Sequence, residues 1–418
     1  ATAWRAADRN DIETALKEIT NIPANSPLAE FKNEEAGFLL LKAGRTAEAE
    51  AYARRAIGTA GIRETRLRLA FAAGFLAAGD RARAAAMLDG IANEAFSARD
   101  RLLAGKLDNQ AVDTGAEAFS EVMTALAGDL VRNQRSTPPL GLAQVARYAN
   151  PNNSAASVLL ALLLELRDRP DASLAVLGSI APGDPMISQV RDNQVRVLAD
   201  QDRHDLALAI ASKAVAMPDA TAVDYSRLGD VYAGAKRHSE AAAAYARAIA
   251  ASEALGNGNG LWTLYLLRAS SLTDANRWPE AKLALEKGLK LSPDQPLLLN
   301  FLGYAKLERG EDMDAAEAMI RKASELAPDD PSITDSLGWA QFKRGKTEEA
   351  IATLQKAAEK DPDQAEIQEH LGDALYVSGR RYEARFAWSA ALLTAEDDVA
   401  KRIEAKIKGG LTPATAAP

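Results

Sequence analysis

The chain has 418 residues, no cysteine and a formal net charge of -8. Its length exceeds what one compact core supports, so several domains or an array of repeats is expected. The acidic total argues against a general nucleic-acid-binding protein, and the missing cysteines exclude disulfides, thiolate catalysis and cysteine zinc sites.

The composition favours helix along the whole chain. The strong helix formers Ala, Leu, Glu, Lys and Arg are abundant, and no run alternates apolar and polar residues as a strand would. No apolar stretch approaches the ~20 residues that cross a bilayer, and the run from Val158 to Leu164 is far too short. The sequence therefore predicts an all-α protein.

Residues 1–150 are predicted to form degenerate helical repeats. Turn glycines followed by alanines indicate two such repeats between Gly44 and Ala85. Residues 100–150 have helical patterning without a clear repeat, and Pro138-Pro139 should break a helix there. Two divergent repeats are predicted at 151–220.

Five clearer repeats are predicted at 221–398, each a pair of helices. The first helix of most repeats carries a Leu-Gly pair, at Leu228-Gly229, Leu302-Gly303, Leu337-Gly338 and Leu371-Gly372. The second helix opens with alanine, at Ala241, Ala281, Ala316, Ala350 and Ala384. Glycine in the first helix lets the second approach closely, and a side chain larger than alanine would clash there.

Turn and cap residues separate these helices. Gly310, Gly345 and Gly379 are expected in turns, where a positive φ suits glycine. The strings Asp-Asp-Pro-Ser (329–332) and Asp-Pro-Asp-Gln (361–364) are expected to cap the helices that follow.

Three other segments lie outside the repeated pattern. Residues 254–260, with three glycines, are expected to form a long flexible loop. Residues 399–408 are expected to form a short amphipathic capping helix, and 411–418 an untied flexible tail.

The repeated pattern resembles the tetratricopeptide repeat (TPR). The repeat at 331–364 matches almost position by position, through Leu337, Gly338, Gly345, Ala350, Leu354, Ala357 and Pro362. The repeats at 222–255, 262–295, 296–330 and 365–398 carry the same landmarks less completely or with one added residue. The resemblance implies a right-handed superhelical solenoid of about nine to ten helix-turn-helix units, whose first helices line a concave groove.

The resemblance also implies which residues face that groove. Carried onto this sequence, the groove positions are Asn300, Tyr304, Leu307, Asp335, Trp339, Phe342, Lys343, Glu369, Asp373 and Tyr376, with Leu297 and Glu366 beside them. Two interpretations of the four aromatic residues stay open: packing between helices, or a partly exposed strip that binds a partner. Trp388 lies at a packing position and is assigned to the core.

A TPR subgroup binds acidic peptide ends through a clamp of lysine and asparagine. The corresponding positions here are acidic or apolar, as at Asp335, Trp339, Glu369 and Asp373, so a clamp of this kind is not predicted. An acidic and aromatic groove instead favours a partner segment with apolar and basic residues.

No catalytic, metal or cofactor site is predicted. His204, His238 and His370 lack metal-ligand spacing and are interpreted as solvated or capping residues. No carboxylate pair stands out as buried, and no phosphate-binding loop or nucleophile elbow is present in the sequence. The chain is therefore expected not to be an enzyme, although an accessory region of an enzyme stays an alternative.

A narrower resemblance rests on several strings in the second half. They are Leu-Gly-Tyr-Ala (302–305), Arg-Gly-Glu-Asp-Met-Asp (309–314), Asp-Ser-Leu-Gly-Trp-Ala (335–340) and Ala-Arg-Phe-Ala-Trp (384–388). These strings resemble large TPR proteins of the proteobacterial envelope, including the outer-membrane lipoprotein that partners a carboxyl-terminal processing protease. The resemblance implies a periplasmic adaptor or scaffold, associated with the outer membrane through a lipid anchor or a partner. The alternatives are a structural or assembly subunit of a membrane-associated complex, and a cytoplasmic location.

Overall fold

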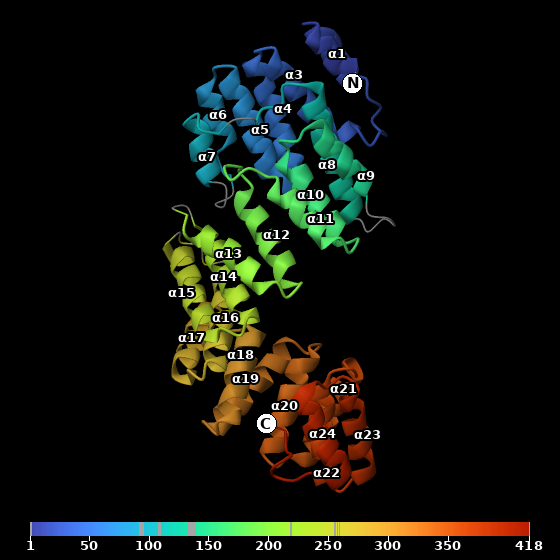
Figure 1. The fold of residues 1–418 in the computed structure, drawn as a ribbon, viewed down its shortest axis with the longest axis vertical. Coiled ribbons are helices and arrows are strands. Elements are labelled where there is room, and N and C mark those ends of the chain that lie inside the picture. The colour runs from blue at the N-terminus through green and yellow to red at the C-terminus, as the bar shows by residue number, and fades with distance from the viewer. Residues whose placement is uncertain are drawn as a thin grey trace. The chain divides into compact units, whose positions relative to one another are not determined.

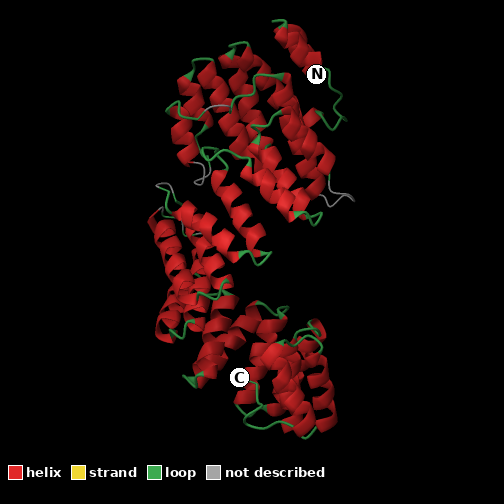
Figure 2. Ribbon diagram, in the orientation of Figure 1, coloured by secondary structure: helices red, strands yellow, loops and turns green. Residues whose placement is uncertain are grey.

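The structure is a computed structural model in which every described element is helical. The described residues are 2–91, 96–107, 110–132, 139–217, 220–254, 256, 258 and 260–417. Within these ranges no strand occurs (Figure 2), so the all-α prediction is confirmed. Two compact units divide the chain, unit 1 at Ala1–Lys236 and unit 2 at Arg237–Pro418, and each is described by itself.

Unit 1 is built largely from antiparallel helix pairs (Figure 1). Its elements are α1 (Thr2–Asp8), α2 (Ile12–Thr20), η1 (Ala29–Phe31), α3 (Lys32–Lys42), α4 (Thr46–Thr59), η2 (Gly61–Arg63), α5 (Glu64–Ala77), α6 (Arg81–Met87), α7 (Phe96–Leu103), α8 (Gly115–Arg132), α9 (Leu140–Ala149), α10 (Ser154–Glu165), α11 (Pro170–Gly178), α12 (Ile187–Ala199), α13 (His204–Val215) and α14 (Ala222–Gly234). The closest pairs are α3 with α4, α5 with α6, α8 with α9, α10 with α11, and α12 with α13.

Unit 2 is also built from helix pairs. Its helices are α15 (His238–Ala254), α16 (Leu261–Asp274), α17 (Trp278–Leu291), α18 (Pro296–Glu308), α19 (Met313–Leu326), α20 (Pro331–Lys343), α21 (Thr347–Lys360), α22 (Ala365–Val377), α23 (Arg381–Leu392) and α24 (Asp397–Gly409). Each repeat predicted between 262 and 398 contains one helix pair, and α24 packs against α23. The repeat predicted at 222–255 contributes α14 to unit 1 and α15 to unit 2.

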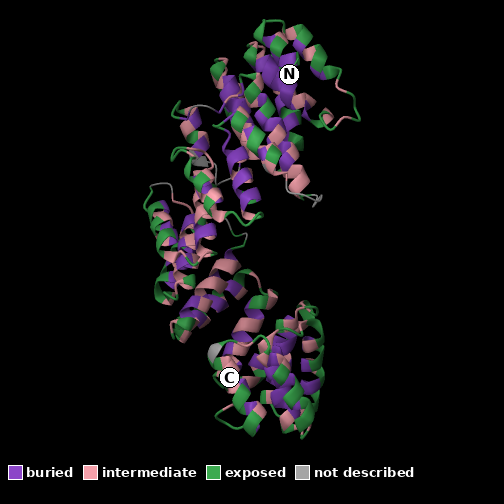
Figure 3. Ribbon diagram, turned by 45° about the vertical axis from the view of Figure 1, so that its right-hand side comes forward, coloured by how far each residue is buried: buried purple, intermediate pink, exposed green. Residues whose placement is uncertain are grey.

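Glycine and alanine at fixed positions allow these pairs to form. Gly345 has φ +76° in the turn between α20 and α21, a conformation that strains other residues. A Cβ on Gly338 would lie 2.6 Å from Cγ of Leu354, and Ala350 at the start of α21 is fully buried. These contacts bear out the close approach expected at the Leu-Gly pairs, and Figure 3 shows buried residues on the inner faces of the helices.

One of the two expected helix caps forms. The Asp330 carboxylate accepts a hydrogen bond from the Ile333 amide at 3.0 Å and caps α20. Gln364, at the start of α22, makes no such bond, because glutamine is longer than the side chains that favour this position. Pro138 and Leu255, Asn257 and Asn259 of the predicted flexible loop lie outside the described residues.

Candidate partner-binding grooves

Unit 1 contains a groove with an apolar floor. Helices α5, α8, α10 and α12 surround a cavity of about 560 Å³. The floor consists of Val158, Leu159, Leu162, Met186 and Val223, and we call this hollow the unit-1 groove. Its volume lies within the roughly 300 to 1,000 Å³ of typical ligand-binding cavities.

Helix α10 contributes an exposed apolar stripe to this groove. Val158, Leu162 and Leu166 follow one another at four-residue spacing, so they share one face of the helix. Leu162 is 40% exposed, and Leu166, where the stripe leaves the groove, is 59% exposed. A contiguous exposed apolar stripe is typical of an interaction surface, whereas scattered exposed leucines are ordinary.

The charged residues on one wall of the groove are paired with each other. The Arg66 guanidinium donates to the Glu121 carboxylate at 2.7 and 2.9 Å and to the Gln110 side-chain oxygen at 3.0 Å. The Asn153 amide donates to the same carboxylate at 3.3 Å. Because these pairs neutralise one another, burial of apolar surface is what the groove offers to a partner.

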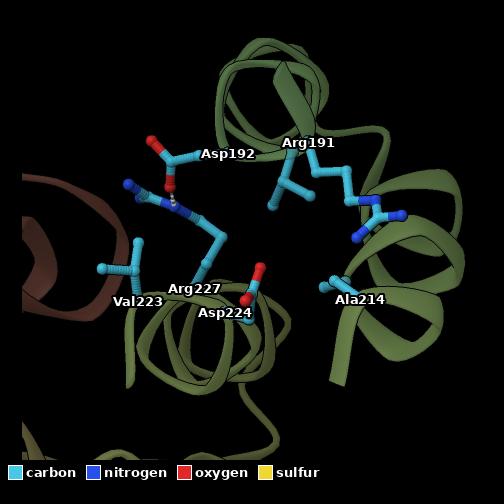
Figure 4. A pocket seen from close by; sticks show the side chains of 8 residues that line it. Arg191, Asp192, Ala214, Val223, Asp224 and Arg227 are labelled. Atoms are coloured by element: carbon cyan, nitrogen blue, oxygen red, sulfur yellow. Dashed lines mark hydrogen bonds and ion pairs between the residues drawn. The ribbon is translucent and has the colours of Figure 1, made fainter. Parts of the chain in front are cut away.

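Two more ion pairs lie at the ends of the groove. Arg63 donates to Glu34 at 2.9 and 3.2 Å, and burial raises the pKa of Glu34 even though Arg63 opposes the rise. Figure 4 shows a smaller pocket between α12, α13 and α14, which shares Asp192 and Val223 with the groove and in which Arg227 donates to Asp192. These pairs join neighbouring helices and hold the groove in shape.

Unit 2 brings the ten sequence-predicted groove residues onto three consecutive first helices. They lie on α18 (Asn300, Tyr304, Leu307), α20 (Asp335, Trp339, Phe342, Lys343) and α22 (Glu369, Asp373, Tyr376). Leu307, Asp335, Trp339, Glu369 and Asp373 are buried, whereas Asn300, Tyr304, Phe342 and Tyr376 are half-buried and Lys343 is exposed. Whether any of them contacts a partner stays a prediction, but the five buried residues make contacts within the chain.

Trp339 belongs to the core and not to an exposed strip. Its ring stacks on His370 with centroids 4.1 Å apart and on Phe342 at 5.0 Å. Its indole N–H donates to Glu308 at 3.0 Å. The packing interpretation therefore applies to Trp339, and Trp388 is fully buried as expected.

His370 was expected to be solvated or to cap a helix, and that interpretation is wrong. The ring is fully buried, and its Nδ1 lies 2.9 and 3.0 Å from the two Asp335 carboxylate oxygens. Burial opposes a charge on the ring, but Asp335 outweighs burial and raises the pKa of His370. The histidine and the carboxylate form an ion pair between α20 and α22.

The expectation of no buried carboxylate pair is also wrong. Glu369 and Asp373 are both buried on α22, and α24 supplies their counterions. Lys406 Nζ lies 2.6 Å from Glu369 and 2.7 and 2.8 Å from Asp373, and Arg402 donates to Glu369 at 2.7 and 2.8 Å. Burial favours a higher pKa for Glu369, but Arg402 and Lys406 together hold that pKa below its usual value. The charged side chains Glu369 and Asp373 are therefore paired with Arg402 and Lys406 inside unit 2.

Comparison with protein families decides what these helix pairs are. Residues 266–331 match the family described as tetratricopeptide repeat, and residues 338–379 match the one described as TPR repeat. Residues 266–331 and 338–379 carry tetratricopeptide repeats. This confirms the broader resemblance found in the sequence, whereas the narrower resemblance to envelope lipoproteins finds no support among the matches. No curated protein sequence matches the chain.

The chain is also similar to several solved structures at low sequence identity. Cut9–Hcn1, a hetero-tetramer of the APC/C, is 17% identical, with 98% of this chain and 83% of that chain covered and a TM-score of 0.45. Yeast Tom70 is 12% identical, with 98% and 94% covered and a TM-score of 0.47. A tetratricopeptide repeat protein from Parabacteroides merdae is 13% identical, with 70% and 98% covered and a TM-score of 0.46.

The tetratricopeptide register contains a signal for the buried ion pair. Asp335 and His370 lie 35 residues apart, at the fifth and sixth positions of successive repeats on first helices that stack on each other. The signal for Lys406 is weaker: it follows Ile403 by three residues, which places a lysine on the apolar face of the amphipathic α24. The unit-1 groove has no such signal, because its repeats are too degenerate to assign groove positions.

The described residues were also searched for metal sites and membrane spans. In the ranges that the structure describes, no group of three or more His, Asp or Glu residues could hold a metal ion. No described helix is both long and apolar enough to cross a membrane.

The ion pair predicts a pH-dependent stability. Because Asp335 raises the pKa of His370, the folded state holds the proton more tightly than the unfolded state does. The stabilisation is complete below the ordinary histidine pKa of about 6.5 and is lost as the pH rises through the higher pKa of the folded state. The free energy of unfolding, measured with urea from pH 6 to 9, should fall with pH in the wild type and less in His370→Gln. His238→Gln is the matched control. If the free energy of unfolding depended on pH equally in the wild type and in His370→Gln, the result would contradict this ion pair.

Proposed function

We propose that the chain is a non-catalytic interaction scaffold that binds an apolar helical segment of a partner protein in the unit-1 groove. The observation that carries this proposal is the apolar floor, which includes the exposed Leu162, inside a cavity of about 560 Å³. The tetratricopeptide repeats support it, since stacked helix pairs present extended binding surfaces.

The chemistry of the groove favours an amphipathic helix as its occupant. Such a helix presents apolar residues three and four positions apart, which complements the four-residue spacing of Val158 and Leu162. The wall charges Arg66 and Glu121 are already paired, so a charged partner segment would gain little from them. Apolar burial, at about 25 cal/mol per Å², would supply the binding free energy.

Leu162→Asp should weaken partner binding at least tenfold, a loss of about 1.4 kcal/mol or more. The substitution places a carboxylate in the middle of the apolar floor, yet Leu162 is exposed enough that the fold should survive. The measurement is a cross-linked pull-down from cells of the source organism, quantified by mass spectrometry, after circular dichroism has shown unchanged helicity.

The matched control is Leu393→Asp, the same change at a leucine that is 85% exposed in unit 2. Partners recovered by the wild type and by Leu393→Asp, but depleted tenfold with Leu162→Asp, would support the groove. Equal recovery by all three proteins would show that partners bind elsewhere, as expected of a structural or assembly subunit. Turnover of a substrate by the isolated chain would overturn the non-catalytic assignment.

We further propose that the scaffold works in the periplasm, with a processing protease or an outer-membrane complex as its partner. The strings at 302–305, 335–340 and 384–388, which resemble envelope TPR proteins, support this location. Cell fractionation followed by immunoblotting should place the protein with periplasmic or outer-membrane markers. Recovery with cytoplasmic markers alone would contradict the location and leave the scaffold role in place.

A further inference from the structure

The segment that follows α24 folds back onto unit 2, although the sequence predicted an untied tail. Gly410 reverses the chain with φ +84°, and a turn follows in which the Thr415 and Ala416 amides donate to the Thr412 carbonyl at 3.0 and 2.9 Å. The turn returns Ala417 to the body of unit 2, beside α20 (Figure 1). We call residues 411–417 the tail segment.

Two residues anchor the tail segment. Leu411 packs against the buried cluster that contains Trp388 and Ile403. Ala417 is 4% exposed and belongs to the cluster of Leu307 and Trp339. Thr412, Pro413 and Ala414, between the anchors, stay exposed.

A backbone hydrogen bond holds the second anchor. The Ala417 amide donates to Oδ2 of Asp373 at 3.0 Å. Lys406 and the Trp388 indole donate to the same carboxylate, at 2.7 to 2.8 Å and 2.9 Å. Because Lys406 already neutralises Asp373, the carboxylate serves here as an acceptor for a peptide amide and not as a site for a basic side chain.

The residues around the tail segment are the ones that the repeat register assigns to the groove. Leu307 and Trp339 share the cluster of Ala417, Asp373 accepts its amide, and the Tyr376 hydroxyl lies against Gly410. The chain thus places a short stretch of its own backbone where a tetratricopeptide groove would place a bound peptide.

We propose that the groove formed by α18, α20 and α22 is a second peptide-binding site, which the tail segment closes. The peptide that replaces the tail segment has small, uncharged residues, as in Leu-Thr-Pro-Ala-Thr-Ala-Ala, because a methyl group fills the buried space at Ala417 and a backbone amide satisfies Asp373. The proposal differs here from the sequence-based expectation of a partner segment with apolar and basic residues. The inference does not depend on the unit-1 groove.

The tail segment is held weakly enough to be displaced. Its anchors are one backbone hydrogen bond, one buried methyl group and one leucine side chain. Its tether gives it an effective concentration in the millimolar range for a short linker, which blocks free peptides of similar affinity. Removing the segment should therefore open the site.

The test uses a fluorescein-labelled peptide of residues 411–418 and fluorescence anisotropy. A chain shortened to end at Gly410 should bind this peptide saturably, and the full chain should bind it at least tenfold more weakly. Circular dichroism confirms that the shortened chain is folded, as expected because α24 and Lys406 are retained. No binding to the shortened chain at millimolar peptide, or equal binding to both chains, would overturn the proposal.

A second variant tests the same site without shortening the chain. Ala417→Glu cannot fit the buried space and brings a like charge to Asp373, so the tail segment should leave the groove and labelled peptide should bind as it does to the shortened chain. Ala416→Glu is the matched control, since Ala416 is exposed, and it should bind peptide no better than the wild type. Equal peptide affinities for the two glutamate variants would also overturn the proposal.

Discussion

Replacing Lys406 by methionine is expected to destabilise unit 2 by about 3 to 5 kcal/mol. The Lys406 side chain is fully buried and lies within 2.8 Å of oxygens from both Glu369 and Asp373. Without it, two buried carboxylates lie close together on one helix, and Arg402 forms its ion pair with Glu369. Urea unfolding followed by tryptophan fluorescence measures the loss, since four of the five tryptophans lie in unit 2.

The control for this prediction is Lys401→Met on the same helix. The Lys401 side chain is 77% exposed and pairs with the exposed Asp398, so its replacement should change stability by about 0.5 kcal/mol or less. The Lys406→Met protein should recover part of its stability in acid, where the stranded carboxylates take up protons. Indistinguishable unfolding curves for the two methionine variants would mean that the buried lysine contributes nothing.

Gly372→Ala is expected to cost about 3 kcal/mol, at the upper end of the range for overpacked cores. A Cβ at Gly372 would fall on the indole ring of Trp388, which is fully buried. The ring cannot move aside without losing its hydrogen bond to Asp373 at 2.9 Å. Differential scanning calorimetry or urea unfolding of unit 2 measures the effect.

Gly409→Ala is the matched control for this second prediction. No heavy atom lies within 4 Å of a Cβ built on Gly409, which ends α24 without a positive φ. Alanine favours helix over glycine by about 1 kcal/mol, so this variant should be as stable as the wild type or slightly more stable. A Gly372→Ala protein as stable as Gly409→Ala would show that α22 and α23 can separate at no cost.

The packing inside each repeat could be predicted because it recurs. Gly345 and Ala350 have counterparts one repeat later in Gly379, which also has a positive φ, and Ala384, which is also fully buried. Their spacing alone therefore indicates their roles. The ion pair of Asp335 and His370 could have been predicted from the repeat register, because the register places the two residues on successive first helices. The spacing of the histidines relative to one another carries no information on this pairing, because the partner is a carboxylate.

The unit-1 groove and the contacts of α24 and the tail segment could not be predicted in the same way. Lys406 and Ala417 lie beyond the last repeat, where no periodicity tells which residues return to the groove. The floor of the unit-1 groove is built by Leu162 and Met186 from repeats that have lost the family's landmarks. In both cases the contacts depend on the tertiary arrangement of elements that the repeat pattern leaves undefined.

The two grooves differ in whether a segment of the chain occupies them. The unit-1 groove has an exposed apolar floor, whereas the groove of α18, α20 and α22 is occupied by the tail segment. A partner helix would therefore bind unit 1 directly, and a peptide would bind unit 2 only by displacing the tail segment. The proposed scaffold function requires the first site alone.

Site-specific photo-cross-linking at Leu162 tests the scaffold proposal most directly. Benzoylphenylalanine placed at position 162, and separately at the exposed control position 393, would be irradiated in living cells. We expect a discrete higher-mass adduct from position 162, containing a second protein, and none from position 393. Adducts at position 393 with none at position 162 would contradict the assignment of the unit-1 groove as the partner site.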